Sequence, residues 1–141
     1  MARKIGTKSY YTKKLDALIS QKVRSIGTCQ RCGNKKGQMQ CAHIISRTNR
    51  TLRWDLNNVL CLCPTCHFWA HQDPLGFTQL VQEFFPERYG YLWAHKDTLT
   101  QRSAKGLEEL YEVLSGNYIE IEVPKKLYKE MRKIEELKET K

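Results

Sequence analysis

The sequence predicts an α+β fold in which two short strands and a helix form a small core, with further helices before and after it. Two CxxC pairs with thirty residues between them enclose the strand segments. The stretches QMQCAHII (38–45) and VLCLC (59–63) are typical of short strands, and the polar residues 46–58 between them are typical of a loop. A helix is then expected from Pro64, because proline is favoured in the first helical turn.

The predicted organisation is a single domain with additions on both sides of the core. Apolar residues at helical spacing predict a first helix that ends near Gly27. After the core, two short helices are expected to break at Pro86, a third to end at Gly116, and 117–123 to form a strand before a charged helix. The parts are a basic N-terminal helix (1–26), the core (27–75) and a helical C-terminal extension with a short strand (76–141), together spanning 1–141.

The basic residues are concentrated in the first part of the chain. The net charge is +9, yet residues 1–53 contain thirteen Lys and Arg and a single acid, Asp16. Such a segment is expected to face a polyanion, although a basic stretch alone is also typical of a solvated face. No apolar run approaches the about 18 residues that would span a bilayer, and no signal peptide is evident. We therefore expect a cytoplasmic protein with no membrane partner.

The two CxxC pairs indicate a metal site. Each pair brings two thiolates to one side of a turn, so that together they can close a tetrahedral shell around Zn²⁺ at about 2.3 Å per bond. A redox motif is less favoured, because it needs only one pair. Cys41 and Cys61 are left over in neighbouring strands and are expected to be small buried residues, with a fifth ligand or a disulfide as alternatives. The predicted ligands of a structural zinc are Cys29, Cys32, Cys63 and Cys66.

The histidines need a separate explanation, because a four-cysteine zinc has no open coordination position. His67 and His71 lie four residues apart on the predicted helix and can chelate one ion, although such a pair is also common as two surface histidines. His43 ends the first strand and precedes a loop that contains three arginines. His95 has no partner in the sequence and is expected on a helix surface.

The stretches AHIISR, NN and LCPTCHFWAH resemble the HNH motif of endonucleases built on the ββα-metal fold. The motif residues fall on His43, Asn58 and His67, and the flanking CxxC pairs are similar to those of the zinc-containing subset of HNH proteins. The nine-residue step from Asn58 to His67, with four more to His71, is similar to the DNase colicins. The AHxxxR and RW..N pieces resemble small phage and bacterial HNH proteins, including the NinG recombination-nuclease family.

The resemblance implies a zinc-containing ββα-metal core and an endonuclease that nicks or cleaves DNA. It implies hydrolysis with one catalytic divalent metal ion (Mg²⁺, Mn²⁺, Ni²⁺ or Zn²⁺), leaving a 5′ phosphate and a 3′ hydroxyl, in a bacterial or phage-infected cell. The implied catalytic residues are His43 as general base, Asn58 as the residue that holds the His43 loop, and His67, which binds the catalytic metal with His71. A neutral imidazole with a pKa near about 6.5 suits the task of the base.

One position departs from the family pattern. Many HNH proteins carry an acid or a histidine before the catalytic histidine, as a further metal ligand, whereas this chain has Ala42. Water or Asp55 would then have to complete the shell, although Asp55 is predicted to cap the turn before Asn57. The departure favours an alternative, a non-catalytic zinc-stabilised DNA-binding protein on a degenerate HNH scaffold. A zinc-ribbon interaction domain is a third reading, which leaves the histidines unexplained.

The expected partner is DNA, held through its phosphates. Arg47 is the first candidate for a phosphate near the cleaved bond, because a guanidinium binds phosphate oxygens in a bidentate way. Trp54 and Trp69 are expected to be packing residues. The C-terminal helix could pack on the core or serve a protein partner or a homodimer. The further candidate phosphate contacts are Arg50, Arg53, Lys13 and Lys14.

Overall fold

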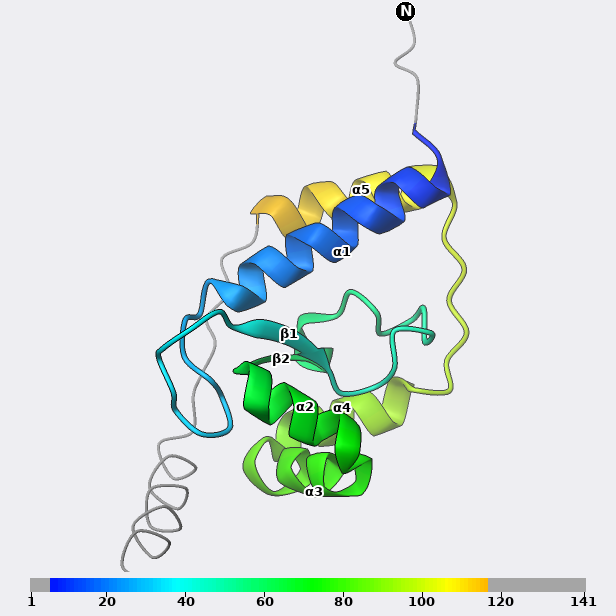
Figure 1. Cartoon of the computed structure of the whole chain (residues 1–141). Helices are drawn as coiled ribbons and strands as arrows, with labels where there is room; N and C mark the ends of the chain where they lie inside the picture. The colour runs from blue at the N-terminus through cyan, green and yellow to red at the C-terminus, as the bar shows by residue number, and fades with distance from the viewer. Residues whose placement is uncertain (1–5, 117–141) are drawn as a thin grey trace, which may run out of the picture.

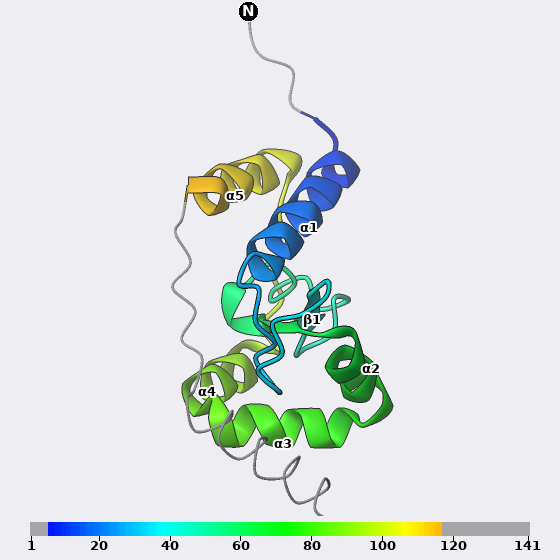
Figure 2. The ribbon, with the colours of Figure 1, turned by 60° about the vertical axis from the view of Figure 1, so that its left-hand side comes forward.

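The computed structural model describes residues 6–116, and its elements form three layers. Helices α1 (Lys8–Arg24) and α5 (Ala104–Gly116) lie side by side on one side of a β-hairpin (Figure 1). On the other side lie the three short helices α2 (Pro64–Gln72), α3 (Pro74–Phe84) and α4 (Pro86–His95), and the turned view shows the same order (Figure 2). The predicted strand at 117–123 and the C-terminal helix lie outside the described residues.

The hairpin at the centre pairs β1 (Gln40–His43) with β2 (Val59–Leu62) in antiparallel register. Cys41 lies opposite Cys61, and His43 lies opposite Val59. All four residues of β2 are buried, which explains why its sequence is a continuous apolar run rather than an alternating one. A two-stranded sheet is marginal alone, so the helices on both sides stabilise it.

Helix α1 follows the predicted boundaries closely. It begins at Thr7, whose side chain accepts a bond from the Tyr10 backbone N–H at 3.1 Å, and it ends before Gly27, whose φ of +73° suits glycine. Its buried face is the predicted apolar stripe, and it packs against β1 and α5. The buried residues of α1 are Tyr11, Leu15, Ile19 and Val23.

Prolines set the starts of the three short helices. Pro64, Pro74 and Pro86 each occupy the first turn of a helix, and the residue before each proline is not helical. Helix α2 therefore ends at Gln72, and Asp73 caps α3 by accepting a bond from the Gly76 backbone N–H at 2.9 Å. The start of α2 at Pro64 and the break at Pro86 are those predicted from the sequence.

The predicted fold class is confirmed: the protein is α+β, with a hairpin followed by a helix, a cluster of the two CxxC pairs, and flanking helices. The division of the chain into one domain with two additions stays a prediction. Within residues 6–116, no helix combines the length and apolarity that crossing a bilayer requires.

Candidate metal centres and the histidine pocket

The four cysteines of the CxxC pairs converge on one point. Their sulfur atoms all lie within 4.8 Å of one another, and three of the four residues are buried. The Cys32 and Cys63 sulfurs are 3.8 Å apart, the edge of a tetrahedron whose centre lies about 2.3 Å from each sulfur. The cluster is therefore consistent with the predicted structural zinc.

A tight turn and one glutamine bring the first pair to the second. The Gly33 backbone N–H donates to the Cys29 carbonyl at 2.9 Å, and Gly33 has a φ of +78°, so the chain reverses between the two cysteines. Gln30 then attaches this turn to β2: its backbone N–H donates to the Cys61 carbonyl at 2.7 Å, and its Oε1 accepts from the Cys61 N–H at 2.8 Å. Cys66, in the first turn of α2, completes the cluster.

The thiols of this cluster cannot all ionise without a cation. A bond from the Cys66 thiol lowers the pKa of Cys29 to about 4, whereas burial raises the pKa of Cys32 to about 11. The same bond to Cys29, together with burial, raises the pKa of Cys66. Without metal, the Cys29 thiolate is expected beside protonated Cys32 and Cys66, and a divalent cation supplies the charge that four thiolates need.

Arg31 adds a cation beside the cluster. Its Nη1 donates to the Cys66 sulfur at 3.3 Å, and its guanidinium lies 3.7 Å from the centroid of the Trp69 ring. Arg31 therefore connects the cluster to the middle of α2. The sequence carries no signal for this contact, because charged residues between two cysteines are ordinary.

The remaining two cysteines stay outside the cluster. Cys41 and Cys61 face each other across the hairpin, and both thiols are free. Cys61 is buried as predicted, Cys41 is partly buried, and burial raises the pKa of the Cys41 thiol to about 12. Neither is a fifth ligand in the described part of the chain.

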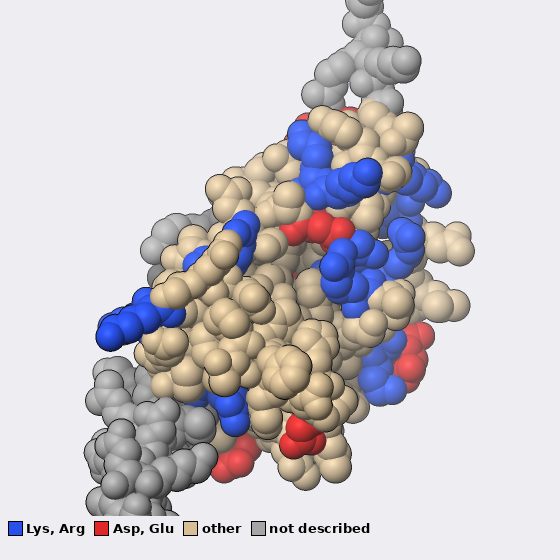
Figure 3. Space-filling view, viewed as in Figure 1, with Lys and Arg blue, Asp and Glu red and all other residues tan. Residues whose placement is uncertain are grey.

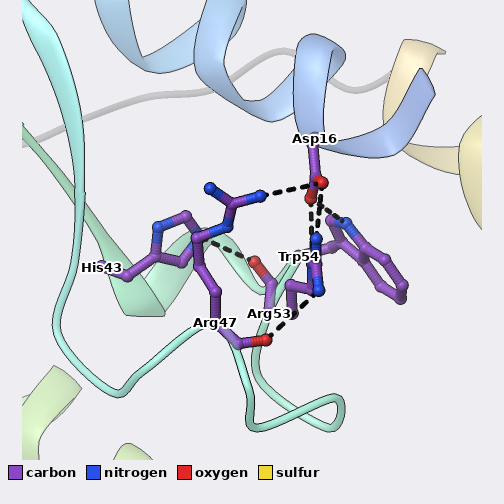
Figure 4. A network of polar contacts seen from close by, with 5 residues as sticks. All are labelled: Asp16, His43, Arg47, Arg53 and Trp54. Atoms are coloured by element: carbon purple, nitrogen blue, oxygen red, sulfur yellow. Dashed lines mark hydrogen bonds and ion pairs between the residues drawn. The ribbon is translucent and has the colours of Figure 1, made fainter. Parts of the chain in front are cut away.

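His43 ends β1 with a defined ring orientation. Its Nε2 lies 3.0 Å from the Arg53 carbonyl oxygen, and a carbonyl oxygen only accepts, so Nε2 carries the proton and Nδ1 keeps its lone pair (Figure 4). Burial lowers the pKa of the imidazole, and the bond to Arg53 only partly opposes this effect. His43 is therefore neutral at pH 7.

Asn58 is fully buried and joins the two ends of the loop that follows His43. Its Oδ1 accepts from the Ile45 backbone N–H at 2.7 Å. Its Nδ2 donates to the carbonyl oxygens of Ile45 at 3.0 Å and Leu52 at 3.1 Å. Three bonds from one buried side chain thus determine where the loop leaves the strand.

His67 and His71 share one face of α2. Their Nε2 atoms lie 3.2 Å apart, and two nitrogens bound to one ion at about 2.1 Å each are separated by about 3 Å. The Nδ1 of His67 donates to Gln40 Oε1 at 2.6 Å, which leaves the Nε2 lone pair free for a metal. Burial, and then the neighbouring His71, lower the pKa of His67, so it is also neutral at pH 7.

The three histidines line one pocket of about 770 Å³ between α1, the hairpin, α2 and α3. The space-filling view shows this hollow beneath α1, with Lys and Arg side chains gathered beside it (Figure 3). Arg47 and Arg53 also line it, and Asp16 reaches it from α1. The structure thus brings together residues that lie up to 55 positions apart in the sequence.

The described residues bring no third ligand to the histidine pair. Within residues 6–116, the four cysteines are the only group of three or more His, Cys, Asp or Glu side chains close enough to share an ion. Ala42 is buried, and the Asp55 oxygens accept from the Asn57 backbone N–H and the Tyr91 hydroxyl. Asp55 therefore caps the turn, as the sequence predicted.

The predicted phosphate contacts differ in how available they are. Arg47 and Arg53 both pair with Asp16, but Arg47 is 57% exposed at its side chain, whereas Arg53 is 16% exposed. Arg50 and Lys13 are exposed, and Lys14 lies over the rings of Tyr10 and Tyr111, away from the pocket. Arg47 is thus the more exposed of the two arginines that line the pocket.

Further predictions about single side chains are confirmed. Trp54 is buried in the core, and Trp69 is partly buried and packs against that core. His95 is exposed near the end of α4. Sequence reasoning missed Gln40 and Asp16 as partners within the pocket. Asp16 had a signal, because it is the only acid among residues 1–53, whereas Gln40 had none.

Comparison with known proteins agrees with this geometry. The family model described as HNH endonuclease matches residues 29–73, a segment that contains all four clustered cysteines, His43, Asn58 and the histidine pair. No curated protein and no solved structure matches the chain. Helices α1, α3, α4 and α5 lie outside the matched segment. Residues 29–73 are therefore similar to an HNH endonuclease domain, and in this chain they contain a hairpin, a helix and a four-cysteine cluster.

Proposed function

We propose that the protein is an endonuclease that hydrolyses DNA phosphodiester bonds with the help of one divalent metal ion. A single observation carries this proposal. One pocket holds a neutral histidine with a free Nδ1 and, on the facing helix, two imidazole nitrogens 3.2 Å apart. A base and a metal-binding pair in one pocket are what metal-assisted hydrolysis of a phosphodiester requires.

His43 is the proposed general base. Its Nδ1 accepts a proton from the attacking water, while its Nε2 proton stays on the bond to the Arg53 carbonyl. Because burial keeps this imidazole neutral, the lone pair is available at physiological pH. Asn58 supports the base by holding the loop that carries Arg53 against the end of β1.

His67 and His71 are the proposed protein ligands of the catalytic ion, which is Mg²⁺, Mn²⁺, Ni²⁺ or Zn²⁺. The donor set fits: both Nε2 atoms face one point, and Gln40 holds His67 in the tautomer that leaves Nε2 free. When bound, the ion stabilises charge on the scissile phosphate and on the leaving 3′ oxygen. Because residues 6–116 supply no third side chain, phosphate and water oxygens would have to complete the shell, so we expect DNA to strengthen metal binding.

Arg47 is the proposed contact to the phosphate at the cleaved bond, because it lines the pocket and keeps an exposed guanidinium. Attack of the deprotonated water on phosphorus breaks the bond to the 3′ oxygen, which takes a proton from solvent water, so the products are a 5′ phosphate and a 3′ hydroxyl. Proton transfer from the attacking water to Nδ1 is assigned to β1, and charge stabilisation is assigned to the histidine pair of α2.

We propose that the DNA backbone beside the cleaved bond follows a groove of about 590 Å³. The groove adjoins the pocket at Trp54, which lines both. Lys8, Arg50 and Arg102 line it from three separate segments, and no acid is among the lining residues. Within residues 6–116 none of these three cations forms an ion pair. Unpaired cations in a groove beside the pocket suit phosphate oxygens.

We also infer a setting from the sequence. The resemblance to small phage and bacterial HNH proteins, such as the NinG family, supports a role in a bacterial or phage-infected cell. The assay does not depend on this setting.

The proposal is tested with supercoiled plasmid and zinc-loaded protein in the presence of Mg²⁺, Mn²⁺ or Ni²⁺. Wild type should convert the plasmid to nicked or linear DNA that a ligase can reseal, because 5′ phosphates and 3′ hydroxyls are its substrates. His43→Ala should lower the rate by about 10²- to 10⁴-fold, the contribution of a general base.

His95→Ala is the matched control, since it removes an exposed histidine outside the pocket. It should nick at the wild-type rate. If no ion supports nicking by wild type, or if His43→Ala nicks as fast, the proposed activity is wrong.

A second candidate function rests on Ala42. A buried alanine stands where many HNH proteins carry a further ligand, and the histidine pair has no third partner among the described residues. This feature favours a non-catalytic, zinc-stabilised DNA-binding protein. Salt-dependent DNA binding without nicking under any of the three ions supports it over the nuclease.

A further inference from the structure

The Asp16 carboxylate reaches from α1 into the histidine pocket, where every oxygen is engaged (Figure 4). Oδ1 accepts from Arg53 Nε at 3.0 Å and from Trp54 Nε1 at 2.9 Å. Oδ2 accepts from Arg53 Nη2 at 2.7 Å and from Arg47 Nη2 at 3.2 Å. Four donors on one carboxylate leave it no lone pair for a metal, so Asp16 does not replace the ligand missing at Ala42.

These contacts hold the guanidinium of Arg53 in one orientation. A guanidinium that bonds both oxygens of a carboxylate has its plane and direction determined. Burial opposes ionisation of Asp16, but the bonds from Arg53 and Trp54 outweigh it and lower the pKa of the carboxyl. The pair is therefore ionised across the range in which a histidine base works. Arg53 Nη1 also donates to the Arg47 carbonyl at 3.5 Å, which closes the loop on itself.

Arg53 also contacts the base directly. The backbone carbonyl of Arg53 accepts the His43 Nε2 proton, so the residue that Asp16 grips by its side chain orients His43 by its main chain. The loop between the strands contains no other strand or helix before η1 (Leu56–Asn58). Its position near Arg53 thus depends on side-chain contacts such as these.

We propose that Asp16 is a positioning residue for His43: it acts through Arg53 to hold the carbonyl that orients the imidazole. Helix α1 lies outside the matched HNH segment, so part of the active-site architecture comes from an added helix. The catalytic consequence rests on the proposed function, whereas the orientation of His43 does not.

Asp16 is also expected to weaken DNA binding, although it speeds the chemical step. This difference distinguishes a positioning role from an effect of its charge alone. Asp16 is the only acid among residues 1–53, and it holds Arg47, the proposed phosphate contact. Removing it should strengthen DNA binding, because a repulsion disappears and Arg47 is released. A positioning role therefore predicts slower chemistry together with tighter binding.

The test uses the full chain with zinc bound and compares Asp16→Asn with Arg47→Gln. Asparagine keeps the size of the side chain and an acceptor for Trp54, but it cannot hold both nitrogens of Arg53. Arg47→Gln is the matched control, because it removes the other arginine from Asp16 without touching Arg53.

Two measurements are needed. In ¹⁵N-labelled protein, the His43 Nε2 proton should give a protected, hydrogen-bonded signal in wild type and Arg47→Gln and should exchange rapidly in Asp16→Asn. In the nicking assay, Asp16→Asn should lower kcat by about 10- to 100-fold, as expected for a misplaced base, while KM for DNA falls or stays constant. Combining it with Arg53→Gln should add little further loss.

Three results would overturn the proposal: no protected Nε2 signal in wild type, an unchanged signal in Asp16→Asn, or faster nicking by that variant. The proton measurement needs no nuclease activity, so a protein that never nicks still tests whether Asp16 positions His43. A thermal melt of each variant identifies any loss of kcat that comes from unfolding.

Discussion

The cysteine cluster and the histidine pocket both take side chains from α2, but they differ in how completely they could surround an ion. The cluster supplies four sulfurs within 4.8 Å, mostly buried, which is a complete shell for a tetrahedral ion. The pocket supplies two nitrogens 3.2 Å apart in an open cavity, and the described residues add no third ligand. A closed site can only stabilise the fold, whereas an open one leaves room for water and phosphate.

The two sites are also connected. Cys66 and His67 are neighbours in the first turns of α2, and Arg31 bonds the cluster while it stacks on Trp69 of the same helix. A metal in the cluster would thus hold the helix that presents the histidine pair. The comparison predicts that damage to the cluster affects both sites, whereas damage to the pocket affects only the second.

The largest effect is expected from Cys66→Ser. Structural zinc contributes about 10–16 kcal/mol in small zinc domains, which is comparable to or larger than the whole stability of a typical domain. The variant should lose zinc and cooperative folding together, as measured by metal content and by circular dichroism during heating.

The matched control is Cys41→Ser, which alters a thiol outside the cluster. It should keep its zinc and a cooperative transition. If Cys66→Ser melts like wild type with normal metal content, the cluster is not a structural zinc site.

The next effect is expected from His67→Ala in zinc-loaded protein. Removing one of two protein ligands should weaken Mn²⁺ binding on the order of 100-fold, the upper end of what loss of an outer-shell partner costs. Isothermal titration calorimetry measures the affinity, and the melting temperature should stay near that of wild type because His67 is only partly buried.

Gln40→Leu gives a graded comparison at the same site. It removes the acceptor of His67 Nδ1 and should weaken Mn²⁺ binding by about 10-fold. His95→Ala should leave the affinity unchanged. Equal Mn²⁺ affinity in wild type and His67→Ala would remove α2 from the proposed catalytic site.

A smaller effect is expected from the groove beside Trp54. Replacing Lys8, Arg50 and Arg102 by alanine together should lower the slope of log affinity against log salt for duplex DNA by about 2 to 3, if each contacts one phosphate. Fluorescence anisotropy at several salt concentrations measures this slope. Nicking at saturating protein should persist, because the pocket is intact.

Lys105 offers a control for total charge, since it is a lysine of α5 that does not line the groove. The single change Lys105→Ala should alter the slope less than any one groove variant. A triple variant with an unchanged slope would rule out this groove as a path for DNA.

The smallest effect concerns pH. Burial lowers the pKa of His43 below its ordinary value of 6.5, so the base stays neutral as the pH falls to that value and loses its lone pair only at lower pH. The single-turnover nicking rate should therefore be level near pH 7 and fall on the acid side, with a midpoint below 6.5. The charged groups around His43 are Asp16, Arg47 and Arg53: the charges of the two arginines lower the pKa of the imidazole together with burial, whereas Asp16 raises it.

Burial, and then His71, also lower the pKa of His67, so Mn²⁺ affinity must be measured across the same pH range. If the Mn²⁺ affinity is constant over the pH range in which the nicking rate falls, the fall reports protonation of His43. A rate that declines already above pH 6.5 would contradict a buried, neutral His43.

The local parts of this molecule were predictable from the sequence. Cysteine spacing, the i and i+4 placement of His67 and His71, and three prolines at helix starts are short-range patterns whose geometry depends on a few neighbouring residues. The same holds for the Asp55 turn cap and for the buried stripe of α1. The sequence alone therefore determined the order of the elements, which cysteines form the cluster, and that His67 and His71 share one face of a helix.

Only the tertiary structure decided what surrounds the reactive groups. Asp16 meets Arg53 across 37 positions, Gln40 meets His67 across 27, and Arg31 meets Cys66 across 35. Such partners depend on which helix packs against which strand, and packing is a collective result of the whole core rather than of any spacing. Asp16 is the only acid of the basic segment 1–53. It lies close to Arg53 because Leu15 and Ile19 belong to the buried face of α1, which packs against the hairpin.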